Sequence, residues 1–271
     1  MSSSLTLPDL ARSLAPRRTL VARTVAVALV DARTRDAAFA LFRTSYENTS
    51  RERFAHDFAE KQHVILLHDS ESGALKGFST VLVREVATPK GPATVVFSGD
   101  TVIDRDYWGQ KQLQLAFARL LATLKLRAPG RPLYWFLLAK GYRTYLMLAN
   151  AFPRSVPRAG VVDDAPMRAL LDELARERYG EQYDAAAGVV RYATPHERVR
   201  GGVAPVTAEV LDNRHARFFI ERNPDHAQGV ELACLADVRL LDVARSALRF
   251  IRSRARHRNR SARGAVRSRV P

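Results

Sequence analysis

One aspartate of this chain stands in a setting that is unusual for a carboxylate. Asp100 follows Ser98-Gly99 and lies between two apolar stretches with the composition of β-strands. A carboxylate held in such a place can take a proton from an attacking nucleophile. The alternative is a structural aspartate at a turn or bulge beside Gly99. The residues themselves leave both interpretations open.

The other residue types that commonly perform catalysis or bind metals stand in less informative settings. The seven histidines form no HExxH pattern and no other metal-ligand spacing, so no metal site is predicted. The single cysteine, Cys234, lies in the apolar run 230–236 and is expected in the core. The chain has no Gly-x-Ser-x-Gly segment and no Walker-type loop, so hydrolase and NTPase activities have no support.

The elements that must position Asp100 are predicted from the periodicity of apolar residues. They begin with a strand, two helices and three strands, which form an antiparallel meander, and they continue as a helix, a strand and a helix. This succession predicts an α/β fold with a mixed sheet and helices on both faces. The expected strands are 21–30, 63–68, 75–85, 93–103, 132–138 and 229–236. The expected helices are 34–46, one beginning near Thr49, 107–126, 141–151, 165–179, 207–222 and 237–256.

Two segments of this succession resemble the GNAT superfamily, the Gcn5-related N-acetyltransferases. Residues 95–121, VVFSGDTVIDRDYWGQKQLQLAFARLL, are similar to the strand, turn and helix with which that family binds its cofactor. Residues 133–152, LYWFLLAKGYRTYLMLANAF, are similar to the following strand and helix, which close the cleft for the acyl thioester. The resemblance covers about half of the chain. It implies neighbouring parallel strands at 93–103 and 132–138 that splay apart near Asp100 and Leu138.

The phosphate loop of the chain departs from the family pattern Arg/Gln-x-x-Gly-x-Gly/Ala. Trp108 stands at the Arg/Gln position, and Lys111 and Leu113 stand at the two small positions. By the resemblance, Trp108, Gly109, Gln110, Lys111 and Arg105 are the expected cofactor-binding residues. The unpaired N–H groups of a helix N-terminus suit a phosphate there, and the lysine and arginine add positive charge.

The resemblance also implies catalytic roles. Asp100 is expected to act as the base or to orient the amine, and Tyr145 is expected to act as the acid, with Tyr142 as the other candidate. Aromatic packing under the cleft is the alternative for both tyrosines. Phe97, together with Trp135, Phe136 and Leu137, is expected to line an apolar channel for a long acyl chain.

Charge separates the C-terminal end from the rest of the chain. The net charge is +15, and ten arginines without an acid fall within residues 245–271. We expect a flexible segment at 1–20, a GNAT-like domain at 21–158, an extension packed on it at 159–244, and a basic tail at 245–271. The tail has the pattern of a basic amphipathic helix around Leu248 and Ile251, which favours an anionic membrane surface or an acyl carrier protein over nucleic acid. A solvated tail without a dedicated partner is the alternative.

These observations predict an acyltransferase that moves an acyl group from a thioester to an amine by direct attack. Acyl-CoA or acyl carrier protein would be the co-substrate, with no permanently bound cofactor. The alternative is a non-catalytic GNAT-like scaffold that binds a membrane or nucleic acid. The lack of long apolar runs and of a secretory signal pattern predicts a cytoplasmic protein, free or peripheral at the inner membrane face.

Overall fold

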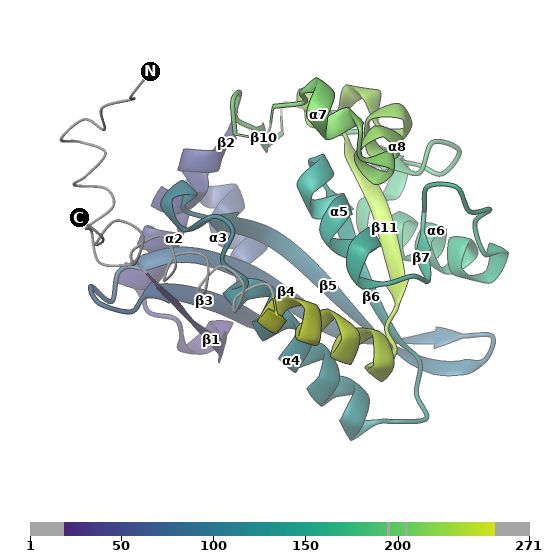
Figure 1. Ribbon diagram of the computed structural model, residues 1–271, viewed down its shortest axis with the longest axis horizontal. Helices are drawn as coiled ribbons and strands as arrows, with labels where there is room; N and C mark the ends of the chain where they lie inside the picture. Colours follow the sequence, from purple (N-terminus) through teal and green to yellow (C-terminus); the bar gives the residue numbers. More distant parts are fainter. Residues whose placement is uncertain (1–18, 194–195, 204, 253–271) are drawn as a thin grey trace, which may run out of the picture.

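The computed structural model describes residues 19–193, 196–203 and 205–252 (Figure 1). A single mixed sheet runs through this part of the chain, in the order β1-β3-β4-β5-β6-β11-β9-β8, with β7 also paired to β11. Its strands are β1 Leu20–Ala26, β3 His63–Asp69, β4 Leu75–Thr88, β5 Gly91–Ile103, β6 Leu133–Ala139, β7 Ser155–Val156, β8 Tyr183–Asp184, β9 Val189–Val190 and β11 Glu231–Asp237. A second, two-stranded sheet pairs β2 Tyr46–Glu47 with β10 Arg198–Val199.

Helices cover both faces of the large sheet. One face packs against α4 Gln112–Arg127 and α5 Tyr142–Ala151. The other face carries α2 Ala32–Ser45 and α3 Arg51–Ala59 over the strands of the N-terminal half, and α6 Ala165–Tyr179 over the C-terminal half. The helices α7 Ala208–Leu211 and α8 Arg214–Arg222 follow, and α8 packs on α5. Short 3₁₀ helices are η1 Val27–Leu29, η2 Arg105–Tyr107, η3 Gly180–Gln182 and η4 Pro224–Gln228.

The predicted mixed α/β architecture is confirmed. β5 and β6 are parallel neighbours joined by α4, and every other paired strand in the large sheet is antiparallel. A helix connecting adjacent parallel strands is the crossover that such a pair requires. This succession of an antiparallel meander and one βαβ unit is the GNAT-like fold that the sequence resemblance implies.

The helix expected at 107–126 begins later than predicted. Residues Arg105–Tyr107 form η2, and α4 starts only at Gln112. Gly109 lies between them with φ +87°, a left-handed conformation that interrupts a helix and that glycine adopts readily. Tyr107, which belongs to η2, is buried like the apolar residues of α4. It therefore extends the apolar pattern beyond the helix and suggests an earlier start.

The range 159–244 contributes to the same sheet as the range 21–158. β11 lies between β6 and β9 and pairs with β6 from Leu232–Ala139 to Asp237–Tyr134. The boundary between a domain and an extension therefore stays a prediction. No helix among the described residues is long and apolar enough to cross a membrane.

The C-terminal end of the described chain is a helix over 240–252, which lies beside α4 (Figure 1). Its buried face carries Val243 and Ser246, and the Ser246 hydroxyl donates to the carbonyl of Ala151 at 3.2 Å. Leu248 and Ile251 lie on the other side and are exposed. The rest of the predicted basic tail, 253–271, lies outside the described residues.

Candidate functional site

A cavity of about 280 Å³ lies where β5 and β6 separate. The two strands pair from Thr94–Leu133 to Ser98–Leu137, and among the described residues the pairing ends there. The cavity is lined by residues of both strands and of α3–α6, together with the segment that follows β9. These are Tyr46, Asp57, Glu60, Lys61, Phe97, Ser98, Gly99, Asp100, Thr101, Phe117, Leu138, Lys140, Thr144, Met147, Arg178, Tyr179, Tyr192, His196, Glu197 and Glu231.

A bulge in β5 turns Asp100 toward this cavity. The register between β4 and β5 shifts between Ser79–Thr101 and Val81–Ser98, so that Gly99 and Asp100 together oppose Thr80. A Cβ atom at position 99 would lie 2.5 Å from the Thr80 hydroxyl oxygen, so glycine is required there. Bulges of this kind re-aim a side chain at the edge of a site. Asp100 therefore lies in a bulge and also faces the cavity, so the two interpretations of this residue from the sequence are compatible.

Lys140 stands between two carboxylates on the cavity wall. Its Nζ lies 3.8 Å from Asp100 Oδ1 and 3.5 Å from Glu231 Oε1. Burial alone would lower the pKa of the Lys140 ammonium, but the charges of Glu231 and Asp100 raise it above its ordinary value. Burial raises the pKa of Glu231, against the opposing effect of Lys140. Lys140 is therefore a half-buried cation at the split between the strands, and it stays charged at neutral pH.

The segment after β9 supplies the opposite wall. His196 Nε2 lies 2.9 Å from Glu197 Oε2, and the His196 ring stacks on Tyr192 with centroids 3.5 Å apart. Burial would raise the pKa of Glu197, but the hydrogen bond from His196 and the charge of Lys140 lower it to about 2. Burial, followed by the charge of Glu231, raises the pKa of Tyr192. At neutral pH Glu197 is ionised and the Tyr192 phenol keeps its proton.

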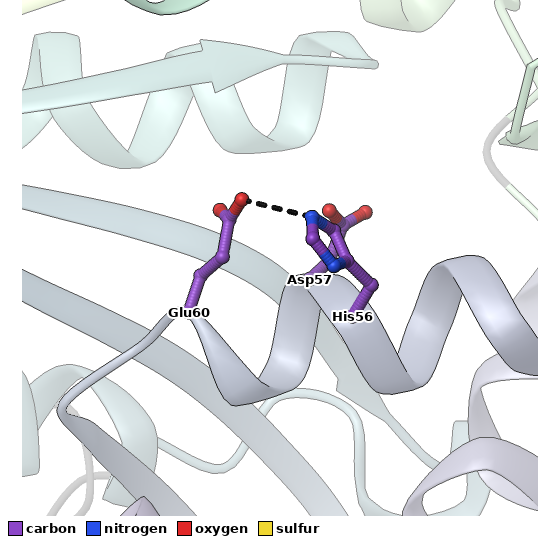
Figure 2. Close-up of side chains that lie close together, drawn as sticks. All are labelled: His56, Asp57 and Glu60. Carbon is purple, nitrogen blue, oxygen red and sulfur yellow. Dashed lines mark ion pairs between the residues drawn. The ribbon is translucent and has the colours of Figure 1, made fainter.

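A third group of ionisable residues lies on α3. Figure 2 shows the side chains of His56 and Asp57 on α3 and of Glu60, which directly follows the helix, pointing to the same side. Their ligand atoms lie within 4.8 Å of one another. Glu60 already lies 2.8 Å from Arg178 Nη2, 3.5 Å from Lys61 Nζ and 3.3 Å from His56 Nε2. A metal ion would compete with these cations for the same carboxylate, so we assign no metal to the group.

A second pocket, of about 340 Å³, adjoins the cavity on the side of α4 and α5. The loop residues Trp108, Gly109, Gln110 and Lys111 line it, and their expected role in cofactor binding stays a prediction. Arg105 does not line it. The pocket and the cavity share four residues, Tyr46, Thr101, Lys140 and Thr144. The two spaces are therefore neighbours on either side of the split between β5 and β6.

The loop is held by its own side chains. The Gln110 side-chain oxygen accepts a hydrogen bond from the Leu20 N–H at 3.0 Å, and the Trp108 indole donates to the Ile103 carbonyl at 2.8 Å. The guanidinium of Arg143 lies 4.4 Å from the centre of the Trp108 ring, which keeps its charge beside the pocket. Lys111, the N-cap of α4, makes no side-chain cap hydrogen bond. The side chain of Lys111 therefore does not cap the first N–H groups of α4.

The two predicted catalytic tyrosines line neither space. Tyr145 is fully buried, its hydroxyl donates to the Pro157 carbonyl at 3.2 Å, and its ring packs against Phe218 of α8. Tyr142 is buried as well, with its hydroxyl 3.5 Å from Arg143 Nε. The structure brings Asp100 to the cavity and turns both tyrosines away from it, so their catalytic role has no geometric support.

The expected acyl channel is also largely filled. Of its four predicted residues only Phe97 lines the cavity, and the other three are buried in the packed interior. Trp135 stacks on Phe117 and donates to the Ser98 hydroxyl at 3.0 Å, while Phe136 packs against Phe97. Cys234 is fully buried in the core, as predicted, and burial raises the pKa of its thiol.

Comparison with known proteins gives partial structural likenesses. No sequence model of a protein family matches the chain, and no curated protein matches it. A GNAT family N-acetyltransferase from Escherichia coli, solved with CoA, is 19% identical over 46% of this chain and 65% of its own, with a TM-score of 0.34. A probable N-acyltransferase from Enterococcus faecalis is 15% identical over 59% of this chain and 44% of its own, with a TM-score of 0.37.

A third structure, glucosamine-6-phosphate N-acetyltransferase from Arabidopsis thaliana, is 16% identical over 44% of this chain and 81% of its own, with a TM-score of 0.31. The chain thus spans less than two thirds of the first two of these proteins. Identities and scores at this level do not carry an activity from one protein to another.

Proposed function

We propose that this chain is an N-acyltransferase that moves an acyl group from an acyl-CoA thioester to an amine. The observation that carries the proposal is the common wall of the two spaces. A donor in the loop pocket and an acceptor in the acidic cavity would meet at Lys140 and Thr101. Holding two reactants in such contact is the main requirement of a direct transfer.

Asp100 is the proposed base. It takes the proton from the acceptor amine as the nitrogen attacks the thioester carbonyl, the carbon–sulfur bond breaks, and the thiolate leaves. The Lys140 ammonium would stabilise the negative charge that develops on the carbonyl oxygen or the thiolate. Direct attack needs no covalent enzyme intermediate, and the buried thiol of Cys234 is not placed to form one.

Tyr46 takes the place that Tyr145 was expected to fill. It lines both spaces, and burial raises the pKa of its phenol to about 12, so that it keeps its proton at neutral pH. Its hydroxyl donates to the Thr101 carbonyl at 3.2 Å. From this position it can donate a hydrogen bond to the leaving thiolate instead.

The donor pocket suits a phosphate-bearing arm. Arg143, Lys111 and the N-terminus of α4 supply positive charge and N–H groups. The side-chain oxygen of Gln114, which lines the same pocket, is buried without a hydrogen-bond partner among the described residues. It can accept a hydrogen bond from an amide N–H of the arm. The filled channel favours a short acyl group, packed against Phe97 and Phe117.

Binding of CoA tests the donor half of the proposal. Replacing Arg143 by Gln should weaken CoA binding, measured by isothermal titration calorimetry, by about tenfold, because one charge-assisted contact to phosphate is lost. Arg119→Gln, an exposed change on α4 outside the loop pocket, should leave the affinity unchanged. Equal CoA binding by the wild type and Arg143→Gln would contradict the assignment of this pocket. If the wild-type protein does not bind CoA at all, the result would favour a non-catalytic scaffold.

We also propose that the helix over 240–252 docks the protein on an acidic surface, a membrane or an acyl carrier protein. The support is the exposed pair Leu248 and Ile251 with Arg245, Arg249 and Arg252 beside them on the same helix. Replacing both apolar residues by Asp should lower binding to vesicles rich in anionic lipid by at least about tenfold, measured by co-sedimentation. Leu126→Asp, at an exposed apolar position of α4, is the matched control. Unchanged sedimentation of the double variant would remove the membrane as the partner.

A further inference from the structure

The cavity is lined by more acidic than basic side chains. The basic residues are Lys61, Lys140 and Arg178, and the acidic residues are Asp57, Glu60, Asp100, Glu197 and Glu231. Arg53 reaches Glu197 from outside the cavity at 3.5 Å. Glu60 and Glu197 are satisfied by direct contacts to Arg178 and His196. The remaining three are Asp57, Asp100 and Glu231, and the last two share one cation, Lys140.

Glu231 is the most informative of the three. The residue is 2% exposed, and its Oε1 atom accepts no hydrogen bond from the described residues. The nearest cation, Lys140 Nζ, lies 3.5 Å away, and His196 Nε2 lies 4.0 Å away. A buried carboxylate oxygen without a donor costs folding free energy unless a ligand satisfies it. Glu231 is one of the residues that line the cavity.

Asp57 and Asp100 form a second acidic position nearer α3. Among the described residues, no side-chain hydrogen bond or ion pair reaches the Asp57 carboxylate, and Lys61 Nζ donates instead to the backbone carbonyl of Asp57 at 2.7 Å. Burial raises the pKa of Asp57, and the charge of Asp100 is the next largest cause. Both residues line the cavity, so a cation bound between them would reduce the repulsion of their like charges.

Aromatic rings complete the lining. Tyr179 and Tyr192 present phenol rings, and burial raises the pKa of both, so the rings stay neutral. Neutral rings beside carboxylates are the chemistry that recognises alkylammonium groups, since the rings attract the cation and pack on the methylene carbons.

Resting on the proposed function, we infer that the acceptor is a compact aliphatic diamine. One ammonium group is held by Asp57 and Asp100, and the other is held by Glu231. The amine beside Asp100 is the one that reaches the split between β5 and β6 and is acylated. A monoamine fills only one of the two acidic positions.

Calorimetric titration of the full chain with 1,4-diaminobutane and 1-aminobutane, with and without CoA, tests this inference without requiring turnover. The diamine should bind at least about tenfold more tightly than the monoamine, the effect of one additional ion pair in a largely buried site. Asp57→Asn should bring the two amines within about threefold of each other. Asp36→Asn, an exposed change on α2, should keep the wild-type preference.

The other possible results of these titrations would overturn the diamine inference or the proposed function. Equal binding of the two amines by the wild type, no binding of either with or without CoA, or a preference kept by Asp57→Asn would overturn the inference. Binding of Ca²⁺ that displaces the diamine would assign the acidic positions to a metal instead. Diamine binding without acyl transfer from any thioester would leave the cation site in place and remove the acyltransferase proposal. Turnover of monoamines without any diamine preference would keep the acyltransferase proposal and remove the diamine inference.

Discussion

Replacing Asp100 by Asn should lower kcat by about 10²- to 10⁴-fold, the usual contribution of a general base. The amide keeps the size and the bulge of β5 but cannot take a proton from the acceptor amine. KM for the thioester should change little, because Asp100 lines the acceptor cavity and not the loop pocket. Steady-state kinetics of thiol release measures both constants.

Asp212→Asn, at an exposed position after α7, serves as the control for Asp100→Asn and should retain full activity. A variant at position 100 that keeps kcat within about twofold of the wild type would contradict the role of Asp100 as base. A rise in KM for the amine alone would assign Asp100 to binding of the acceptor.

Replacing Lys140 by Met should lower the free energy of unfolding by about 3–5 kcal/mol, the usual cost of leaving a buried charge without its partner. The charge left behind belongs to Glu231, whose Oε1 lies 3.5 Å from Lys140 Nζ. Adding Glu231→Gln should therefore restore part of the loss, and urea denaturation of both variants measures it. Lys90→Met, at an exposed position, should change the stability by less than about 0.5 kcal/mol. Additive losses in the double variant would show that the two residues do not interact.

The strands and helices could be predicted because their signal is local. For most elements the observed bounds lie within a few residues of the expected ones. The strand expected at 63–68, for example, is β3 His63–Asp69. The parallel pairing of β5 with β6 followed from the order of elements, since a helix joins them. The late start of α4 depended on one glycine conformation, which an apolar pattern does not reveal.

The cavity was less predictable because its walls come from distant parts of the chain. Asp100 was identified since a carboxylate within an apolar strand pattern is visible in the sequence. Glu231 begins a strand and resembles an ordinary strand boundary until β11 is placed beside β6. Lys140 directly follows β6, and only the three-dimensional structure shows that both Asp100 and Glu231 face it. Tyr145 was expected at the cleft, but its ring packs against Phe218 of α8. Nothing in the sequence of its own helix indicated that α8 would cover that face.

The loop at 108–113, which departs from the family pattern, also has a structural explanation. Leu113, which stands where the family has a small residue, is 2% exposed and packs into the core from the first turn of α4. It therefore does not occupy the pocket. Gly109 supplies the turn, and the Trp108 ring is held against Arg143 at the pocket wall. The departures from the family pattern are compatible with an open donor site.

We propose that the loop pocket and the acidic cavity form one site for acyl transfer. Release of free thiol from acetyl-CoA, followed continuously in the presence and absence of 1,4-diaminobutane, measures this transfer. We expect thiol release to depend on the amine and to yield the N-acetylated diamine, detected by mass spectrometry. Asp100→Asn should reduce this release by at least about 10²-fold. Thiol release at the same rate without the amine, or no acetylated amine with a protein that binds both ligands, would contradict it.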